Sequence, residues 1–226
     1  FADAVEKGFR ESPQVDLESL SDYEQMKSKL SMEVVSAEKN AELLESVPHE
    51  RMEDMAVVYR FVLDQTDSGN GTILVTNQLL DQYGITKEQL RADAMENAPE
   101  IRPSEIRGMS EVMSELAPGM IPEVATEDEQ MFVATVPDKI HGAGVIAYPN
   151  FMEDAAEKMG GDFFVLPSSI HEVLLVKDNG QMTAKELENM VKEVNATQVE
   201  PADQLTDHVY HYDSQNHIFE LADKYE

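Results

Sequence analysis

The segment Leu166–Glu172 holds the side chains best suited to chemistry, because Ser168 and Ser169 stand just before His171 and Glu172. A serine hydroxyl next to an imidazole could serve acyl transfer, with either serine as the nucleophile and His171 as the base. No Gly-x-Ser-x-Gly elbow surrounds the serines. The alternative is a structural turn, in which Ser169 bonds its own backbone and His171 bonds a nearby carbonyl. Both interpretations stay open.

Three histidines near the C-terminal end raise the question of a metal site. His208, His211 and His217 stand close to Asp207 and Asp213 in a predicted hairpin. Positions 208 and 211 of a strand point to opposite faces, so these two histidines cannot share an ion without a bulge. His211 and His217 could face each other across the hairpin, but they would supply only two of the three or four ligands that a site needs. We therefore predict no metal site.

Two other histidines could line a cleft, and the familiar cofactor motifs are absent. His49 follows Pro48 at an element boundary, and His141 falls in a predicted turn. The chain has neither a phosphate-binding loop nor a dinucleotide fingerprint, and Asp67–Gly71 lacks the pattern of a calcium loop. Cysteine is absent, which excludes thiolate metal sites and thiol nucleophiles in this chain. We expect no cofactor, and His49 and His141 are retained as candidate binding residues.

Hairpins and capped helices must position these side chains. Ser21 and Glu24 have capping-box spacing, and Tyr23, Met26, Leu30 and Val34 follow at helical spacing, so a helix is predicted from Ser21 towards Pro48. Further helices are predicted over 77–83, 86–97, 111–116, 150–159 and 183–194. Strands are predicted over 56–63, 72–75, 131–136, 143–148, 163–166, 172–176, 207–212 and 218–221.

This order of elements lacks regular β-α-β alternation, which indicates an α+β fold: a mostly antiparallel sheet of hairpins with helices packed on it. Residues 1–20 are interpreted as a connector from a missing N-terminal segment. A Pro-, Gly- and acid-rich stretch at 117–129 suggests a division into halves over 21–120 and 121–226. The alternative is one continuous domain over 21–226.

The charge is unusual, with 45 acidic and 17 basic residues among 226 and a net charge of −28. Such a field repels nucleic acid and anionic membranes, so neither is expected as a partner. Three interpretations fit the charge: solubility, attraction to a basic protein partner, and mimicry of DNA. A mimic would gather its acids on one elongated face.

Several segments resemble a family of proteins of unknown function from Gram-positive (Firmicute) gut bacteria. They are Asn40–His49, Thr72–Asn77, Ile140–Gly144, Leu166–Val173 and Asp207–Asp213, and the resemblance extends from about Asp22 onward. It implies a bacterial cytoplasmic protein, sometimes carried with mobile elements, whose relatives often have a further N-terminal segment. It implies no activity, so no catalytic residues follow from it.

We therefore expect a non-catalytic binding or regulatory module with an acidic surface that attracts a basic protein. One alternative is a serine-type hydrolase built on the Leu166–Glu172 turn. The other is an acidic DNA mimic.

Overall fold

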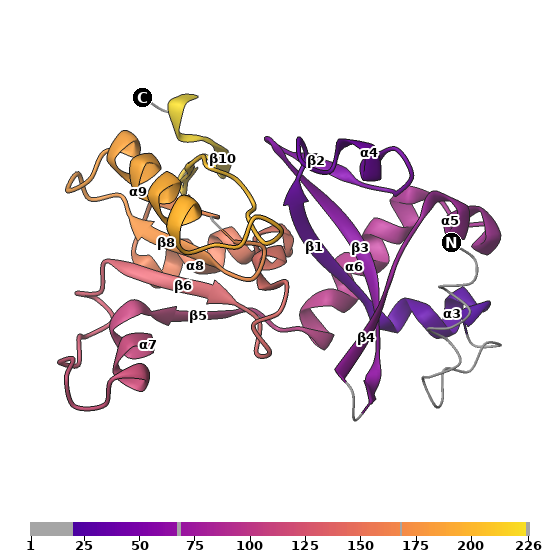
Figure 1. Ribbon diagram of the computed structural model, residues 1–226, viewed down its shortest axis with the longest axis horizontal. Helices are drawn as coiled ribbons and strands as arrows, with labels where there is room; N and C mark the ends of the chain where they lie inside the picture. The colour runs from indigo at the N-terminus through magenta and orange to yellow at the C-terminus, as the bar shows by residue number, and fades with distance from the viewer. Residues whose placement is uncertain (1–19, 67–68, 168, 225–226) are drawn as a thin grey trace.

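The computed structural model describes residues 20–66, 69–167 and 169–224, and it contains two antiparallel sheets side by side (Figure 1). The predicted connector 1–20 lies almost entirely outside these ranges. The first sheet is built around the long strand β3 (Met55–Thr66). β1 (Leu30–Ser36) pairs with one edge of β3, while β2 (Glu50–Met52) and β4 (Gly69–Leu74) pair with the other.

The second sheet has the strand order β10-β9-β7-β8-β6-β5, and all neighbours are antiparallel. Its strands are β5 (Glu105–Gly108), β6 (Met131–Thr135), β7 (Phe163–Leu166), β8 (Val173–Lys177), β9 (Tyr210–Asp213) and β10 (Ile218–Leu221). Two mostly antiparallel sheets with helices on them confirm the predicted α+β fold class.

The helices follow the predicted caps closely. Thr76, Thr86 and Thr183 each accept a hydrogen bond from a backbone N–H of the first turn, and Thr183 forms a full capping box with Glu186. These residues begin α5 (Asn77–Tyr83), α6 (Lys87–Ile101) and α9 (Ala184–Thr197). The remaining helical segments are α3 (Tyr23–Met26), η1 (Lys27–Lys29), α4 (Ala41–Leu44), α7 (Met109–Leu116), η2 (Gly142–Ala147), α8 (Phe151–Met159) and η3 (Ala222–Lys224).

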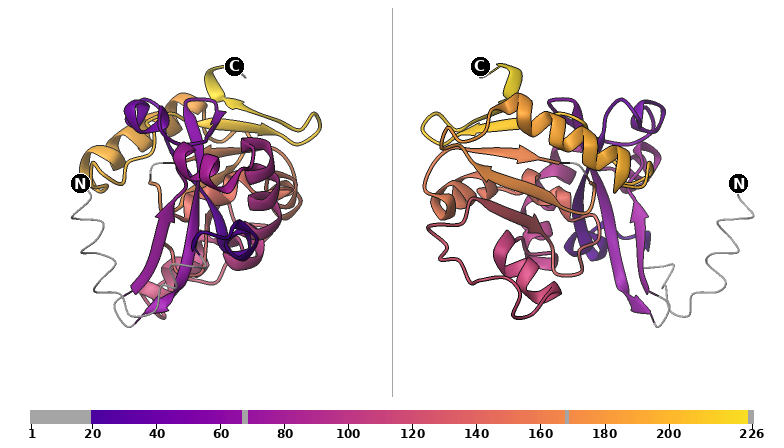
Figure 2. Two further views of the ribbon diagram at one scale, coloured as in Figure 1. Left: turned by 90° about the vertical axis from the view of Figure 1, so that its right-hand side faces the viewer. Right: turned by 60° about the vertical axis from the view of Figure 1, so that its left-hand side comes forward.

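A single large core links the two sheets. It includes Met32 and Phe61 of the first sheet, Phe132 and Phe163 of the second, and Val145 of η2 between them. The opposite face of the second sheet packs against α9 in a smaller cluster, and Figure 2 shows α9 lying across that sheet. The element η2 therefore joins the two sheets.

Two glycines of η2 allow this segment to pack closely against β1 and β6. A Cβ atom on Gly144 would stand 2.4 Å from the carbonyl oxygen of Met32 in β1. A Cβ atom on Gly142 would stand 2.0 Å from Thr135 Oγ1. Only glycine leaves room for the chain at these two positions.

Two predicted elements are wrong. The helix expected from Ser21 ends after one turn, because Leu30–Ser36 forms strand β1, which is almost wholly buried. The strand expected over 143–148 is the 3₁₀ segment η2, which is surrounded by protein and pairs with no strand among the described residues. Smaller differences are the N-cap of α3, which is Asp22 rather than Ser21, and the N-cap Asn150, whose side chain makes no capping bond.

The strand β5 is absent from the prediction. It pairs with β6, so the second sheet begins at residue 105. Along the described residues no helix combines the length and the apolar character required to cross a membrane.

Candidate functional site

A pocket of about 360 Å³ lies where the first sheet meets segments that flank the second sheet. We call it the inter-sheet pocket. Its apolar wall comes from Val35, Leu43, Val58, Leu74, Ile170, Pro201 and Ala202, and its polar wall from Glu33, Ser36, Lys39, Asn40, Arg60, His141 and Gln204. A cavity in which an apolar wall faces convergent polar groups is a common setting for a ligand.

The central polar group of the pocket is the carboxylate of Glu33 on β1. Its side chain is only 3% exposed. Oε2 accepts a hydrogen bond from Arg60 Nε at 2.8 Å, whereas Oε1 has no hydrogen-bond partner among the described residues. A buried carboxylate oxygen without a donor costs about 1–3 kcal/mol or more. Glu33 therefore offers an unmet acceptor to whatever enters the pocket.

His141 stands beside this carboxylate at the entrance to η2. Its backbone is left-handed, with φ 55°, and its Nδ1 lies 3.8 Å from Glu33 Oε1, which is too long for a hydrogen bond. Burial lowers the pKa of His141 below its usual value, although the nearby Glu33 charge opposes that shift. Burial therefore favours the uncharged form of His141, and Arg60 is the charged partner of Glu33.

His171 supports His141 from the segment between β7 and β8. Its Nδ1 accepts a hydrogen bond from the His141 backbone N–H at 3.1 Å, and the two ring centroids are 5.5 Å apart. Its Nε2 lies 3.4 Å from Asp203 Oδ1. Both ring nitrogens of His171 thus face groups other than a serine hydroxyl, and the residue holds His141 in place.

The other predicted site residues of this segment have different surroundings. Ser169 Oγ accepts a hydrogen bond from the His171 backbone N–H at 3.0 Å, which is the arrangement expected of a turn serine. Ser168 lies outside the described residues. Glu172 is exposed and borders a small hollow with Thr135 and Lys139. The Ser169 contact is the one that the turn interpretation describes, whereas His171 accepts a hydrogen bond from a backbone N–H and does not bond the carbonyl which that interpretation expected.

The remaining histidines are dispersed over the molecule. His49 Nδ1 lies 3.0 Å from the Val47 carbonyl oxygen, away from the inter-sheet pocket. His208 Nδ1 lies 2.7 Å from Asp54 Oδ2, and His211 Nε2 lies 2.9 Å from Asp178 Oδ2. His217 lies 3.6 Å from Glu153. His211 and His217 therefore have separate carboxylate partners and do not share a site.

Glu33 and Arg60 were not predicted as site residues from the sequence, although the residues around Glu33 have the alternating pattern of a strand. Leu30, Ser31, Met32, Glu33 and Val34 alternate between apolar and polar, which is the period of a strand. A strand register places Glu33 beside a neighbouring strand, where a cross-strand arginine becomes possible. The helical spacing from Tyr23 to Val34 concealed this alternation.

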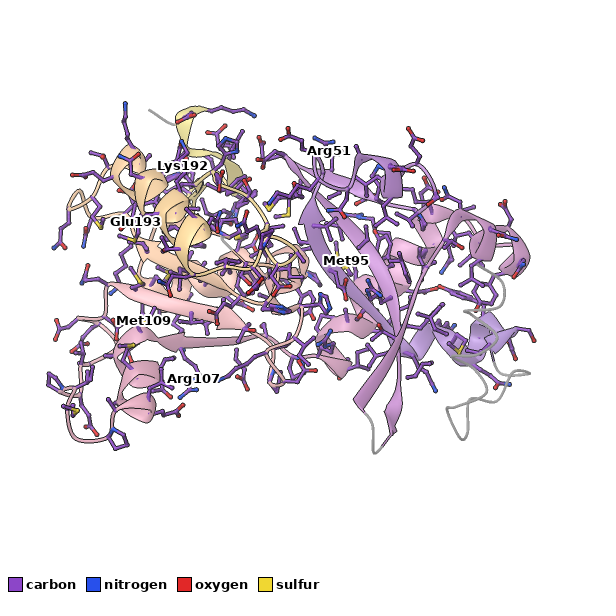
Figure 3. All side chains as sticks on the ribbon, viewed as in Figure 1. Arg51, Met95, Arg107, Met109, Lys192 and Glu193 are labelled. Carbon is purple, nitrogen blue, oxygen red and sulfur yellow. The ribbon has the colours of Figure 1, made fainter. Side chains whose placement is uncertain are left out.

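Basic side chains elsewhere tend to pair locally with acids. Arg107 contacts Glu111 at 2.9 Å and also Glu115, and Lys192 contacts Glu188. Figure 3 labels the two basic residues, Arg107 and Lys192. Because acids greatly outnumber bases, such pairs leave an excess of negative charge on the molecule.

Comparison with known proteins gives one match. The model of a family described as "Family of unknown function (DUF5688)" matches residues 2–214. No curated protein and no solved structure matches the chain. The match confirms the resemblance to a family without an assigned activity, and it transfers no site residues.

Proposed function

Because the chain belongs to DUF5688, a family of unknown function, its role must be argued from its own geometry, and we propose that it is a non-catalytic binding module. The ligand occupies the inter-sheet pocket. The observation that carries this proposal is Glu33, which lines a space of about 360 Å³ and whose buried oxygen Oε1 has no donor among the described residues. A ligand with an N–H group would satisfy that oxygen and recover the cost of its burial.

The rest of the pocket narrows the ligand class. Arg60 already balances the charge of Glu33, so the pocket requires a donor and does not require a further positive charge. Lys39 Nζ, held at 3.1 Å by Gln204 Oε1, stands at the pocket wall and can donate to an acceptor. We therefore propose a compact amide or zwitterion, with its N–H end at Glu33 and its acceptor end at Lys39. Its apolar part would lie against Val58 and the other aliphatic side chains of the wall.

The test uses ligand-observed NMR with three fragment sets: amides and zwitterions, simple carboxylates, and apolar molecules. The wild-type chain should select the first set. In the variant Glu33→Gln, Arg60 should hold the amide oxygen and leave the amide N–H₂ facing the pocket. The variant should therefore no longer bind fragments that present an N–H donor, and it should bind fragments that present a carbonyl acceptor instead.

A matched control is available in a second hollow of about 350 Å³. It is also bordered by a carboxylate, Glu153, together with Tyr212 and His217. Glu153→Gln should bind the same fragments as the wild-type chain. The proposal fails if no set binds, or if Glu33→Gln keeps the fragment preferences of the wild type.

Charge supports a second binding role, the attraction of a basic protein partner. The net charge of −28 raises the association rate of a cationic protein, and salt screens this effect. Immobilised protein should retain a partner from lysate at low salt and release the same partner at high salt. If nothing is retained at low salt, the idea of electrostatic steering loses its basis.

The serine hydrolase and the DNA mimic, which were the alternatives from the sequence, can each be tested separately. A serine hydrolase would react with a fluorophosphonate probe, and the turn contacts of Ser169 lead us to expect no labelling. A DNA mimic would compete with DNA for a basic DNA-binding protein. A bacterial origin and a cytoplasmic location remain part of the proposal, and fractionation of the source cells would test the location.

A further inference from the structure

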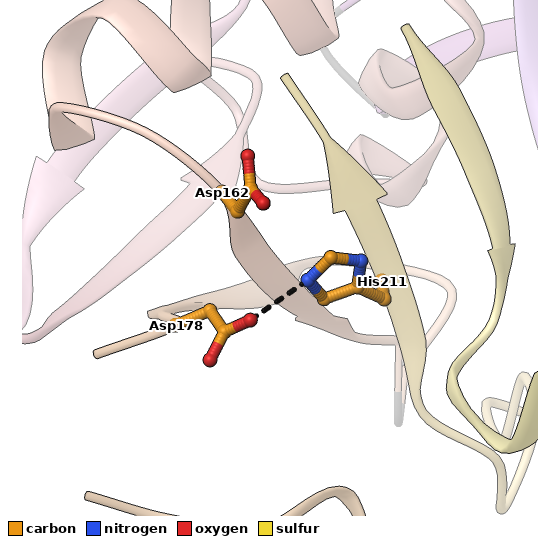
Figure 4. Close-up of side chains that lie close together, drawn as sticks. All are labelled: Asp162, Asp178 and His211. Atoms are coloured by element: carbon orange, nitrogen blue, oxygen red, sulfur yellow. Dashed lines mark hydrogen bonds and ion pairs between the residues drawn. The ribbon is translucent and has the colours of Figure 1, made fainter. Parts of the chain in front are cut away.

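Three potential metal ligands meet at one end of the second sheet, apart from the inter-sheet pocket. They are Asp162, Asp178 and His211, and one ligand atom of each lies within 4.8 Å of the others (Figure 4). His211 is buried, with 1% of its side chain exposed, and its Nε2 lies 2.9 Å from Asp178 Oδ2. An imidazole and two carboxylates supply the three protein ligands of an open metal site.

The register of three neighbouring strands brings these residues together. Asp162 directly precedes β7 and Asp178 directly follows β8, and the backbone N–H of Asp178 donates to the Asp162 carbonyl oxygen at 3.1 Å. On the other side of β7, His211 of β9 pairs with Phe164. Since Phe164 is two residues from Asp162, all three ligand side chains lie on one face of the sheet.

A cation between the two carboxylates would reduce the repulsion between them. Asp162 and Asp178 stand opposite each other at the ends of the neighbouring strands β7 and β8, and like charges in that position destabilise a sheet. The Asp162 carboxylate is also fixed, because its Oδ1 accepts hydrogen bonds from Ser214 N at 2.9 Å and Ser214 Oγ at 2.6 Å. Such outer contacts orient a carboxylate in the way that metal sites require.

We infer that Asp162, Asp178 and His211 bind a divalent transition-metal ion, with Zn²⁺ as the best fit to one nitrogen and two oxygen ligands. Zn²⁺ binds imidazole nitrogen and carboxylate oxygen at about 2.0–2.2 Å, so the three side chains must draw closer around the ion. The metal takes the place of the proton between His211 and Asp178. That proton moves to Nδ1 of a neutral ring, or passes to water from a doubly protonated ring, so the metal-bound ring is a neutral imidazole. Because an imidazole is among the ligands, Mg²⁺ should bind much more weakly.

Isothermal titration calorimetry of the chelator-treated protein with ZnCl₂ tests this inference. The wild-type chain should bind one ion, and Asp162→Asn and Asp178→Asn should each weaken binding at least about 10-fold. These changes preserve shape and remove the like-charge contact, and far-UV circular dichroism will show whether the fold is kept. His208→Gln is the matched control, since His208 forms a similar pair with Asp54 at 2.7 Å but lies outside the three-ligand group.

A second measurement identifies the ligand directly. In a two-dimensional ¹H–¹⁵N spectrum of the histidine rings, Zn²⁺ should shift the His211 Nε2 signal and leave His208 unchanged. The inference is overturned if the wild type binds no Zn²⁺, if either asparagine variant binds as tightly as the wild type, or if Mg²⁺ binds equally well. None of these results bears on the inter-sheet pocket, because Glu33 and its neighbours are not among the ligands.

Discussion

Replacing Gly144 by alanine should strain the junction between the two sheets. The new Cβ atom would stand 2.4 Å from the Met32 carbonyl oxygen, 3.1 Å from the Met32 carbonyl carbon and 3.1 Å from Glu33 Cα. These atoms belong to the backbone of β1, so no side chain can rotate away to relieve the contact. Either η2 or β1 must move, although both belong to the packed core.

The expected cost is that of overpacking a well-filled core, about 1–3 kcal/mol. For a chain of this size, each kcal/mol lowers the melting temperature by roughly 2–4 °C, so Gly144→Ala should lower it by roughly 2–12 °C. Differential scanning calorimetry measures the shift. Gly71→Ala is the control, because its Cβ would meet the Leu63 side chain at 3.5 Å, an ordinary contact. A Gly144→Ala melting temperature equal to that of the wild type would refute the reasoning.

Three further predictions concern single side chains. Because burial lowers the pKa of His141, the unfolded chain binds more protons than the native one below about pH 6.5, so stability should fall on acidification. His141→Gln should flatten this pH dependence in urea unfolding. Thr183→Ala removes the cap of α9 and should cost about 1 kcal/mol in the same assay, whereas an unchanged midpoint would contradict the cap. For Asp54, burial favours the neutral carboxyl, but hydrogen bonds from Tyr210, His208 and Thr206 outweigh it and lower the pKa. The stability from these bonds is present above about pH 4 and is lost as the pH falls further, so Asp54→Asn should remove that acid-sensitive contribution.

Local chemistry made much of the fold predictable. Threonine caps fixed the starts of α5, α6 and α9, because a side-chain oxygen at that position satisfies a free backbone N–H whatever the tertiary surroundings. The hairpins β3–β4 and β9–β10 were likewise predicted from turn residues between β-branched and aromatic segments. These signals act over a few residues, so the sequence displays them directly.

The junction and the pocket depend on contacts between distant residues, and the sequence does not display those. Strand β1 buries both faces, including Glu33, so its apolar residues also fitted a helical period. Segment 142–147 looked like a strand because it is apolar, but its glycines allow close packing against β1. The sequence suggested that His171 bonds a nearby backbone carbonyl, but its Nδ1 accepts a hydrogen bond from the backbone N–H of His141, 30 residues away in the chain.

The position of η2 along β1 also affects how the molecule meets other copies of itself. Among the described residues β1 pairs with β3 alone, so its second side would be an open edge for another extended chain. Exposed edges of this kind are where sheets join between molecules and aggregate. The backbone of η2 covers the Met32 carbonyl on that side, and only a glycine at position 144 lets it come near enough. The contact that unites the two sheets thus also closes this part of the β1 edge to another extended chain.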